Sequence, residues 1–146
     1  LEKLRATRGV KIYGERPRVG VISFNLSDLP HALVGAVMCF EAGIGLRTAC
    51  FCAQRYVRHL LGLTENDVDP ALYESNRLDK IPGMVRISLA PYNTREEIDI
   101  LVKWLKILNE NKYEFRRRYK FSPQFGGYWP VGLDENAYFN LAGVSL

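Results

Sequence analysis

Two arginines and one cysteine are the residues of this sequence whose types and spacing could do chemistry. Arg47 stands five residues before Cys52, in a segment that reads as a loop. Arg86 lies inside a short apolar strand, where a charged side chain needs a specific partner. A guanidinium offers a planar fork of N–H donors that matches a carboxylate, and a thiolate is the nucleophilic form of cysteine. The pattern therefore indicates a site that holds a carboxylate and presents a sulfur nucleophile, which is half of an active site.

The composition is that of one globular domain. The chain has 146 residues, of which 47% are hydrophobic and 25% charged, and no apolar run approaches the roughly 18 residues that a membrane helix needs. Three cysteines is an odd number, and Cys50 and Cys52 are too close for an ordinary disulfide, which favours a reducing, cytoplasmic setting. The first residue, Leu1, is not methionine, so we expect a chain cut from a longer one.

A basic segment near the C-terminus contributes much of the formal charge of +4. Residues 112–120 combine arginines and lysines with aromatic side chains, a mixture that suits RNA because cations bind phosphate and rings stack on bases. A solvated helix end with aromatic anchors on the core explains the same mixture. We favour the second interpretation over nucleic acid.

Strands and helices alternate along the chain, which predicts an α/β or α+β fold with helices packed on a small sheet. The apolar segments predict strands at 19–25, 44–47 and 83–90. Helices are predicted from about residue 30 to 40, with Ser27 or Asp28 as the cap, at 53–61 with Gly62 as the stop, and from Thr94 onward. Residues 1–18 read as a helix end and a turn-rich approach, 63–82 as irregular with one helical turn around 70–74, and the chain after Asn111 as an extended tail on the surface.

The last predicted helix has the clearest signals. Thr94 and Glu97 form a capping box, in which the hydroxyl and the carboxylate satisfy free N–H groups at the helix start. Apolar residues then recur at three- and four-residue steps, which indicates one buried face. They are Ile98, Leu101, Trp104, Leu105 and Leu108.

An ordered series of motifs resembles the C-terminal small domain of the class V aminotransferase family, pyridoxal-phosphate enzymes that include cysteine desulfurases and selenocysteine lyases. The series comprises residues 21–25, 41–44, Arg47-Thr48 with 52–54, 85–88 and 92–94. The resemblance implies a connecting segment at 1–18, a small-domain core at 19–110 and a C-terminal extension at 111–146, with the large cofactor-binding domain absent.

The resemblance also implies roles for the three residues. The cysteine in the position of Cys52 becomes a persulfide, the arginine in the position of Arg86 grips the substrate carboxylate, and Arg47 lies beside the same site. The substrate would be L-cysteine or a similar amino acid, and a sulfur-acceptor protein would be a partner. The parent enzyme would be a homodimer, whereas this chain alone would be inert.

Two positions depart from the family pattern. The best-known desulfurases carry two histidines just before the cysteine, and here Cys50 and Phe51 occupy those positions; a proline that usually follows is Arg55. A Cys-Phe-Cys loop after an arginine also resembles the molybdenum-cofactor sulfurases of the same superfamily. No lysine of the chain follows the Ser/Thr-His pair that marks the Schiff-base lysine in this family, so the lysine that binds pyridoxal phosphate is expected outside this chain.

Each candidate also has a plainer interpretation. Most free cysteines are small buried hydrophobes, and this is our expectation for Cys50 and Cys39. A zinc site from Cys50, Cys52 and His59 would lack a fourth ligand, and His31 is isolated. Two other functions stay open: a small domain that serves an aminotransferase, epimerase or lyase for another amino acid, with Cys52 incidental, and a standalone binding module without the cofactor half.

Overall fold

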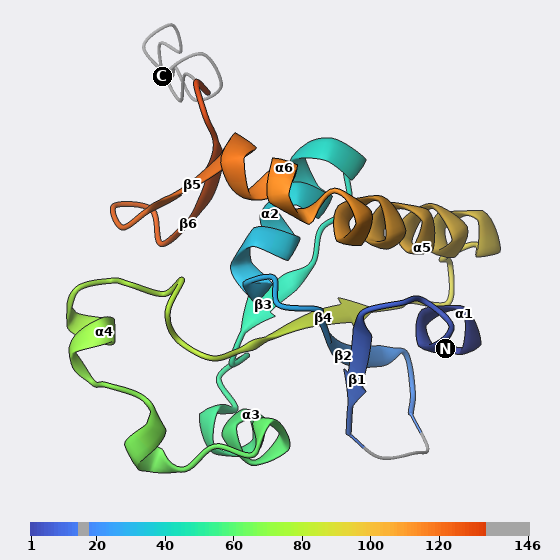
Figure 1. Cartoon of the computed structure of the whole chain (residues 1–146). Helices are drawn as coiled ribbons and strands as arrows, with labels where there is room; N and C mark the ends of the chain where they lie inside the picture. Colours follow the sequence, from blue (N-terminus) through green and yellow to red (C-terminus); the bar gives the residue numbers. More distant parts are fainter. Residues whose placement is uncertain (15–17, 134–146) are drawn as a thin grey trace, which may run out of the picture.

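The computed structural model describes residues 1–14 and 18–133, and Figure 1 shows their arrangement. The strands are β1 (Val10–Tyr13), β2 (Val21–Leu26), β3 (Arg47–Ala49), β4 (Met84–Ser88), β5 (Tyr119–Ser122) and β6 (Gly127–Pro130). The helices are α1 (Glu2–Arg5), α2 (His31–Ala42), α3 (Gln54–Leu61), α4 (Ala71–Glu74), α5 (Arg95–Glu110) and α6 (Lys112–Arg118), with a 3-10 turn η1 at Glu65–Asp67.

A four-stranded sheet in the order β1-β2-β4-β3 forms the centre, and every neighbouring pair is antiparallel. Helices α2 and α5 cover one face of this sheet, while α3 lies on the opposite side (Figure 1). The prediction of a mixed α/β fold, with a small sheet packed against helices, is confirmed.

Alternation along the strands decides which side chains face the helices. On β2, Ile22, Phe24 and Leu26 are buried, and the residues between them point to the other face. Their partners on β4 are Val85 and Ile87, which complete the layer beneath α2 and α5. Burying this apolar layer supplies most of the driving force for folding.

The start of α2 differs from the prediction, because neither Ser27 nor Asp28 caps it. The helix begins after Pro30 without a side-chain cap. The Ser27 hydroxyl instead lies 2.6 Å from the Asn109 side-chain oxygen, and the Asp28 carboxylate accepts from Lys112 and Arg116 of α6. Both residues tie the turn before α2 to the C-terminal helices.

The end of α2 explains why the next strand begins later than predicted. Gly43 adopts a left-handed conformation with φ of 66°, and the Ile44 N–H donates to the Met38 carbonyl oxygen at 2.9 Å. This Schellman-type closure uses Ile44 to satisfy the helix end. Strand β3 therefore runs over Arg47–Ala49 rather than 44–47.

The prediction that Cys39 belongs to the core is wrong, because its side chain is exposed. The residues of α2 that face the sheet are Leu33, Val34, Val37 and Met38. One step beyond Met38 turns the side chain away from the core.

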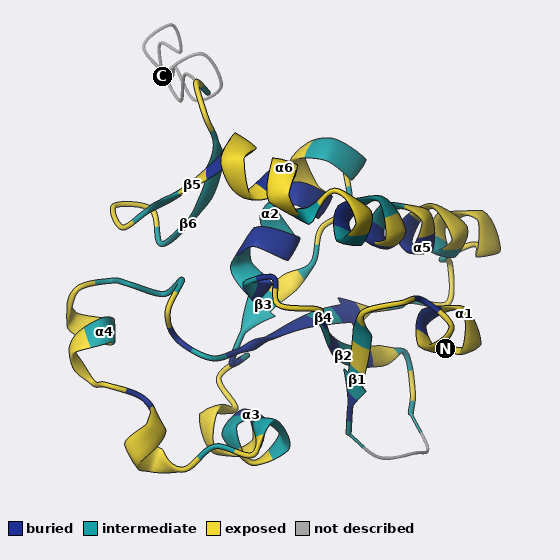
Figure 2. Ribbon diagram, viewed as in Figure 1, coloured by how far each residue is buried: buried dark blue, intermediate teal, exposed yellow. Residues whose placement is uncertain are grey.

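The two ends of the chain are more ordered than predicted. Residues 10–13 form β1, which pairs along β2, and Leu4 of α1 is buried in the main core. After Asn111 the chain forms α6 and the β5–β6 hairpin, and Figure 2 shows buried positions on the ribbon of this part. Phe115 and Tyr119 belong to the main core. The helix-end interpretation of residues 112–120 is therefore correct, and the surface-tail interpretation is wrong for this part; residues 134–146 lie outside the described residues.

The capping box predicted for α5 is confirmed. The Thr94 hydroxyl accepts from the Glu97 N–H at 3.2 Å, and the Glu97 carboxylate accepts from the Thr94 N–H at 2.9 Å. Hydrogen bonds to this carboxylate from the Asn93 side-chain amide and from the Thr94 N–H hold the pKa of Glu97 below its usual value. Leu101, Leu105 and Leu108 are buried as the spacing predicts, with Val102 beside them.

Candidate functional site

The β3–β4 ladder brings the two candidate arginines together. Arg47 and Arg86 are direct cross-strand partners, so their side chains leave the same face of the sheet. This is the face turned away from α2 and α5, because Thr48 and Val85, the next pair, point toward the helices. We call it the arginine face, defined by Tyr13, Ser23, Asn25, Arg47 and Arg86.

The Arg86 side chain is half-buried and makes no hydrogen bond or ion pair with the residues that the structure describes. Its Nε is buried and has no partner among those residues. The guanidinium carbon lies 5.0 Å from the centroid of the Phe51 ring, which is a cation–π distance. The side chain is thus packed by an aromatic ring while its N–H donors stay unpaired.

The loop after β3 presents Cys52 at the surface. Ala49, Phe51 and Cys52 have φ values of 80°, 52° and 61°, in the left-handed region that residues other than glycine seldom adopt. Such conformations cost free energy, and they concentrate at functional sites. The Cys52 side chain is exposed.

Cys50 is buried in a second, smaller cluster with Tyr13, Val57 and Met84. Its thiol donates to the carbonyl oxygen of Pro82 at 3.4 Å. Burial raises the pKa of this thiol, and the charge of Arg58 opposes the rise. Cys50 is therefore a packed thiol that anchors one end of the loop, in agreement with the plainer interpretation.

The segment before β4 forms the floor under this loop. The Ile81 carbonyl lies 3.0 Å from Nε2 of the buried His31, and the Gly83 carbonyl accepts from the Asn25 amide at 3.1 Å. A Cβ atom on Gly83 would stand 2.7 Å from His31 Nε2 and 2.8 Å from the Ala49 Cα. Only glycine at position 83 allows the segment before β4 to approach α2 and β3 this closely.

Sequence reasoning missed the residues that surround the arginines. Ser23 is the partner of Arg86 on β2 and Tyr13 the partner of Ser23 on β1, so both lie on the arginine face. For Ser23, the sequence does carry a signal: polar residues alternate with apolar ones along β2, which places the polar ones on the face opposite the core. Phe51 was noticed only as a departure from the family pattern, and nothing in the sequence places its ring over Arg86.

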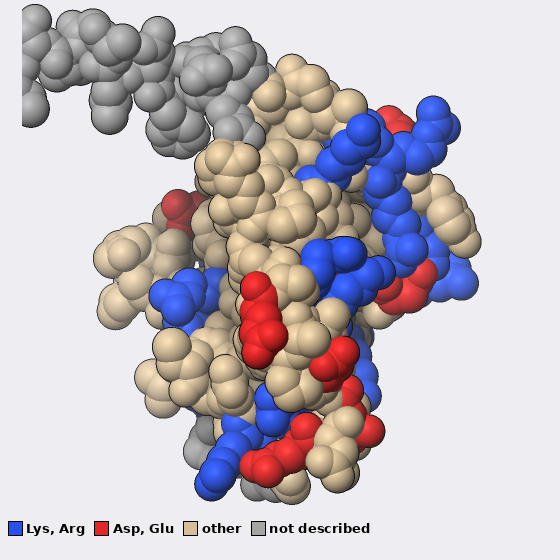
Figure 3. Space-filling model, turned by 90° about the vertical axis from the view of Figure 1, so that its left-hand side faces the viewer, with Lys and Arg blue, Asp and Glu red and all other residues tan. Residues whose placement is uncertain are grey.

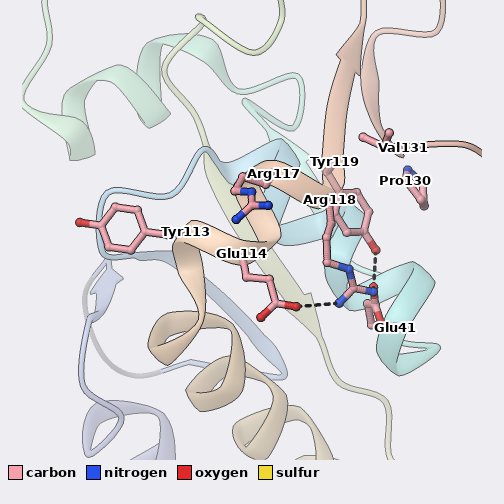
Figure 4. A pocket seen from close by; sticks show the side chains of 8 residues that line it. All are labelled: Glu41, Tyr113, Glu114, Arg117, Arg118, Tyr119, Pro130 and Val131. Carbon is pink, nitrogen blue, oxygen red and sulfur yellow. Dashed lines mark hydrogen bonds and ion pairs between the residues drawn. The ribbon is translucent and has the colours of Figure 1, made fainter.

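A separate hollow of about 690 Å³ lies beside α6, and its charged side chains pair mainly with one another (Figure 4). Arg118 donates to Glu41 at 2.6 Å, and the Tyr119 hydroxyl donates to the same carboxylate at 3.1 Å. Burial and the neighbouring Glu41 charge raise the pKa of Tyr119. These contacts form a polar brace between α2 and α6, while Arg117, which also lines the hollow, makes no ion pair with the described residues.

The basic residues of α6 are also largely paired. Lys112 and Arg116 both contact Asp28, at 2.8 and 2.9 Å. On the face shown in Figure 3, Lys and Arg side chains gather along the upper right, with Asp and Glu at the edges of this group. The pairs with Asp28, together with that of Arg118 and Glu41, fix α6 to the turn before α2 and to α2 itself.

Comparison with known proteins defines the class to which this chain belongs. Residues 1–101 match the family model described as Aminotransferase class-V. The chain belongs to this family.

The individual relatives are cysteine desulfurases. The chain is 37% identical over 106 residues to a cysteine desulfurase of Serratia proteamaculans, and 36% identical over 110 residues to one of Klebsiella pneumoniae, which is 73% and 75% of this chain. It resembles the apo structure of a cysteine desulfurase from Thermococcus onnurineus NA1, with a TM-score of 0.55 and 27% identity, over 75% of this chain and 23% of that one. The chain spans 21% and 22% of the two curated relatives, so it corresponds to about a fifth of such a protein.

The family depends on pyridoxal phosphate, and the described residues show no site for this cofactor. The four strands of the central sheet contain one lysine, Lys11, which stands on β1 with β2 between it and β4. Its ammonium group lies over the Tyr13 ring at 5.0 Å. Within residues 1–14 and 18–133, no three His, Cys, Asp or Glu side chains gather as a metal site, and no helix is long and apolar enough to cross a membrane.

Proposed function

We propose that this chain is the carboxylate-binding and thiol-presenting part of a cysteine desulfurase-like enzyme. Arg86 binds the carboxylate of an amino-acid substrate, Arg47 adds a second positive charge beside it, and Cys52 accepts the sulfur. The Schiff-base lysine and the phosphate donors for pyridoxal phosphate come from a large domain outside this chain. The divisions at residues 18 and 110 are part of the same proposal.

One observation carries the proposal: the loop with Cys52 is packed against Arg86 through Phe51. The contact joins Arg86, which has no acidic partner among the described residues, to the residue before Cys52. The Cys52 side chain itself is exposed. The thiolate is the form of cysteine that attacks, and an exposed thiol is open to substrate. The relatives named cysteine desulfurase support the same assignment.

The proposed reaction conserves atoms and electrons. L-cysteine and the Cys52 thiol give alanine and a Cys52 persulfide, so the sulfur moves from the substrate to the protein. A thiol-bearing acceptor protein then takes the outer sulfur and regenerates Cys52. Arg86 and Arg47 hold the substrate carboxylate during the transfer, and the parent enzyme acts as a homodimer.

The test uses the complete protein that carries this chain, with pyridoxal phosphate and L-cysteine. Digestion and mass spectrometry of the Cys52 peptide should show one added sulfur atom that a thiol reductant removes, together with release of alanine. Cys52→Ser should abolish the transfer, while Cys50→Ser, the matched control, should keep it. An unmodified peptide without alanine would instead favour an aminotransferase, epimerase or lyase for another amino acid. A complete protein without any Schiff-base lysine would favour a standalone binding module.

A further inference from the structure

The contact between Phe51 and Arg86 has a chemical consequence for ligand binding. An arginine on a sheet face is usually held by an acidic side chain, which occupies its in-plane N–H donors. Here the ring of Phe51 lies against the guanidinium, and the described residues offer it no hydrogen-bond acceptor. A cation–π contact uses the flat face of the guanidinium and leaves the edge that a carboxylate needs.

Arg86 needs the support of the Phe51 ring because of its cross-strand partner, Arg47. Arg47 stands directly opposite Arg86, and like charges at such positions repel one another. Arg86 has no acidic neighbour among the described residues to hold it. Without the Phe51 ring, its side chain would sample many rotamers and turn away from Arg47 into water. The negative face of the aromatic ring offsets part of this repulsion and restricts the guanidinium.

Phe51 packs against the smaller cluster of buried residues, and its neighbour Cys50 belongs to that cluster. Cys50 before it is buried and hydrogen-bonded to the Pro82 carbonyl oxygen. Cys52 after it is exposed, and both Phe51 and Cys52 have a left-handed backbone. The ring therefore lies between the smaller cluster and the Arg86 guanidinium.

We propose that Phe51 is a positioning residue that holds Arg86 for carboxylate binding without competing for its donors. The inference rests on the proposed function, because it assumes that Arg86 binds a carboxylate. The same contact keeps the Cys52 loop at a constant distance from the bound carboxylate. The ligand class is a monocarboxylate whose oxygens meet the guanidinium edge.

The experiment measures acetate binding to this 146-residue chain by NMR, through the side-chain Nε–H signal of Arg86. In the unmodified chain, the ring of Phe51 should shift this signal away from the position of an exposed arginine, and acetate should shift it further. Phe51→Leu removes the ring but keeps apolar volume, and it should weaken acetate binding about threefold to tenfold. Phe51→Tyr keeps the ring and should restore binding.

The matched control is Tyr113→Leu. Tyr113 is exposed on α6 and also packs against a cation, with the Lys112 ammonium 5.4 Å from its ring centroid, so the change removes an equivalent contact outside the site. Acetate affinity should not change in this variant. A loss equal to that of Phe51→Leu would overturn the proposal, since it would reflect a general effect on the chain.

The outcomes separate the inference from the function on which it rests. The Arg86→Lys variant lacks the Arg86 Nε–H, so its acetate binding is followed through the backbone N–H signals of β3. If this variant binds acetate as well as the unmodified chain does, the carboxylate role of Arg86 fails, and the proposed function fails with it. If Arg86→Lys loses binding while Phe51→Leu keeps it, only the role of Phe51 fails. If Phe51→Leu does not fold, the unmodified chain still decides: an Arg86 Nε–H signal without a ring-induced shift overturns the proposal.

Discussion

Arg47 and Arg86 are opposed on antiparallel strands β3 and β4, and both side chains leave the face of the sheet that α2 and α5 do not cover. Cross-strand neighbours lie roughly 5 Å apart at their Cβ atoms, so the two charges repel. A protein selected for stability alone would avoid this pair. The repulsion between Arg47 and Arg86 lowers the stability of the fold, and a bound anion would offset it.

The first prediction concerns this cost. Arg47→Gln should raise the free energy of unfolding by about 0.2–1 kcal/mol, because it removes a like charge opposite Arg86. The gain should shrink at high salt, where exposed charges are screened. Urea unfolding at low and high salt measures both effects. Arg117→Gln on α6 is the control and should change stability by less than about 0.5 kcal/mol; an equal gain there would show that net charge, not the pair, is responsible.

The second prediction concerns the three thiols. Iodoacetamide should modify the exposed Cys52 and Cys39 in the folded chain, and Cys50 only slowly. Burial raises the pKa of the Cys50 thiol, and only the thiolate reacts. Mass spectrometry of peptides after brief alkylation measures the order. Alkylation in urea is the control, and there the three should react alike; rapid labelling of Cys50 in the folded chain would contradict its packed position.

The sequence was a good guide wherever a local signal decides the structure. Thr94 and Glu97 mark the start of α5, and the apolar, β-branched run at 19–25 predicts a buried strand, which β2 confirms. Gly62 ends α3 in a left-handed conformation, as predicted. These features depend on neighbours in the chain, so they can be read from it.

The sequence was a poor guide wherever distant contacts decide. Ser27 and Asp28 have the residue types of helix caps. In the structure, the Ser27 side chain bonds to Asn109 and the Asp28 side chain to α6, so neither caps α2. The strand at Val10–Tyr13 forms because β2 offers it a free edge. The contact of Phe51 with Arg86 joins residues from a loop and a strand, and no spacing in the sequence predicts it.

The third prediction concerns His31 and pH. Burial lowers the pKa of His31 below its usual 6.5, against the opposing effect of its hydrogen bond with the Ile81 carbonyl. The unfolded chain then binds more protons than the folded chain as the pH falls through about 6.5, so stability at this site is full above that pH and falls below it. A charged imidazole would also carry a proton on Nδ1, which is buried without a partner among the described residues.

The measurement for His31 is urea unfolding between pH 7.5 and pH 5.5. His31→Gln should reduce the loss of stability over this range, at the expense of some stability at pH 7.5. His59→Gln is the control, because His59 is exposed on α3 and its replacement should leave the pH dependence unchanged. An unchanged slope in His31→Gln would mean that another group causes the loss.

The last prediction concerns the C-terminal extension, where two aromatic residues of α6 differ in burial. Phe115 is 4% exposed and belongs to the main core, whereas Tyr113 is 73% exposed. Phe115→Ala should lower the free energy of unfolding by about 3–5 kcal/mol, since it removes a buried ring and leaves a cavity. Tyr113→Ala, two residues away on the same helix, should cost less than about 1 kcal/mol.

Because a domain of this kind is stable by only about 5–15 kcal/mol, removal of the chain after Asn111 should unfold much of it. Urea unfolding of the two variants and the truncated chain tests this: a truncation that keeps full stability would mean that α6 and the β5–β6 hairpin rest on a core that is complete without them.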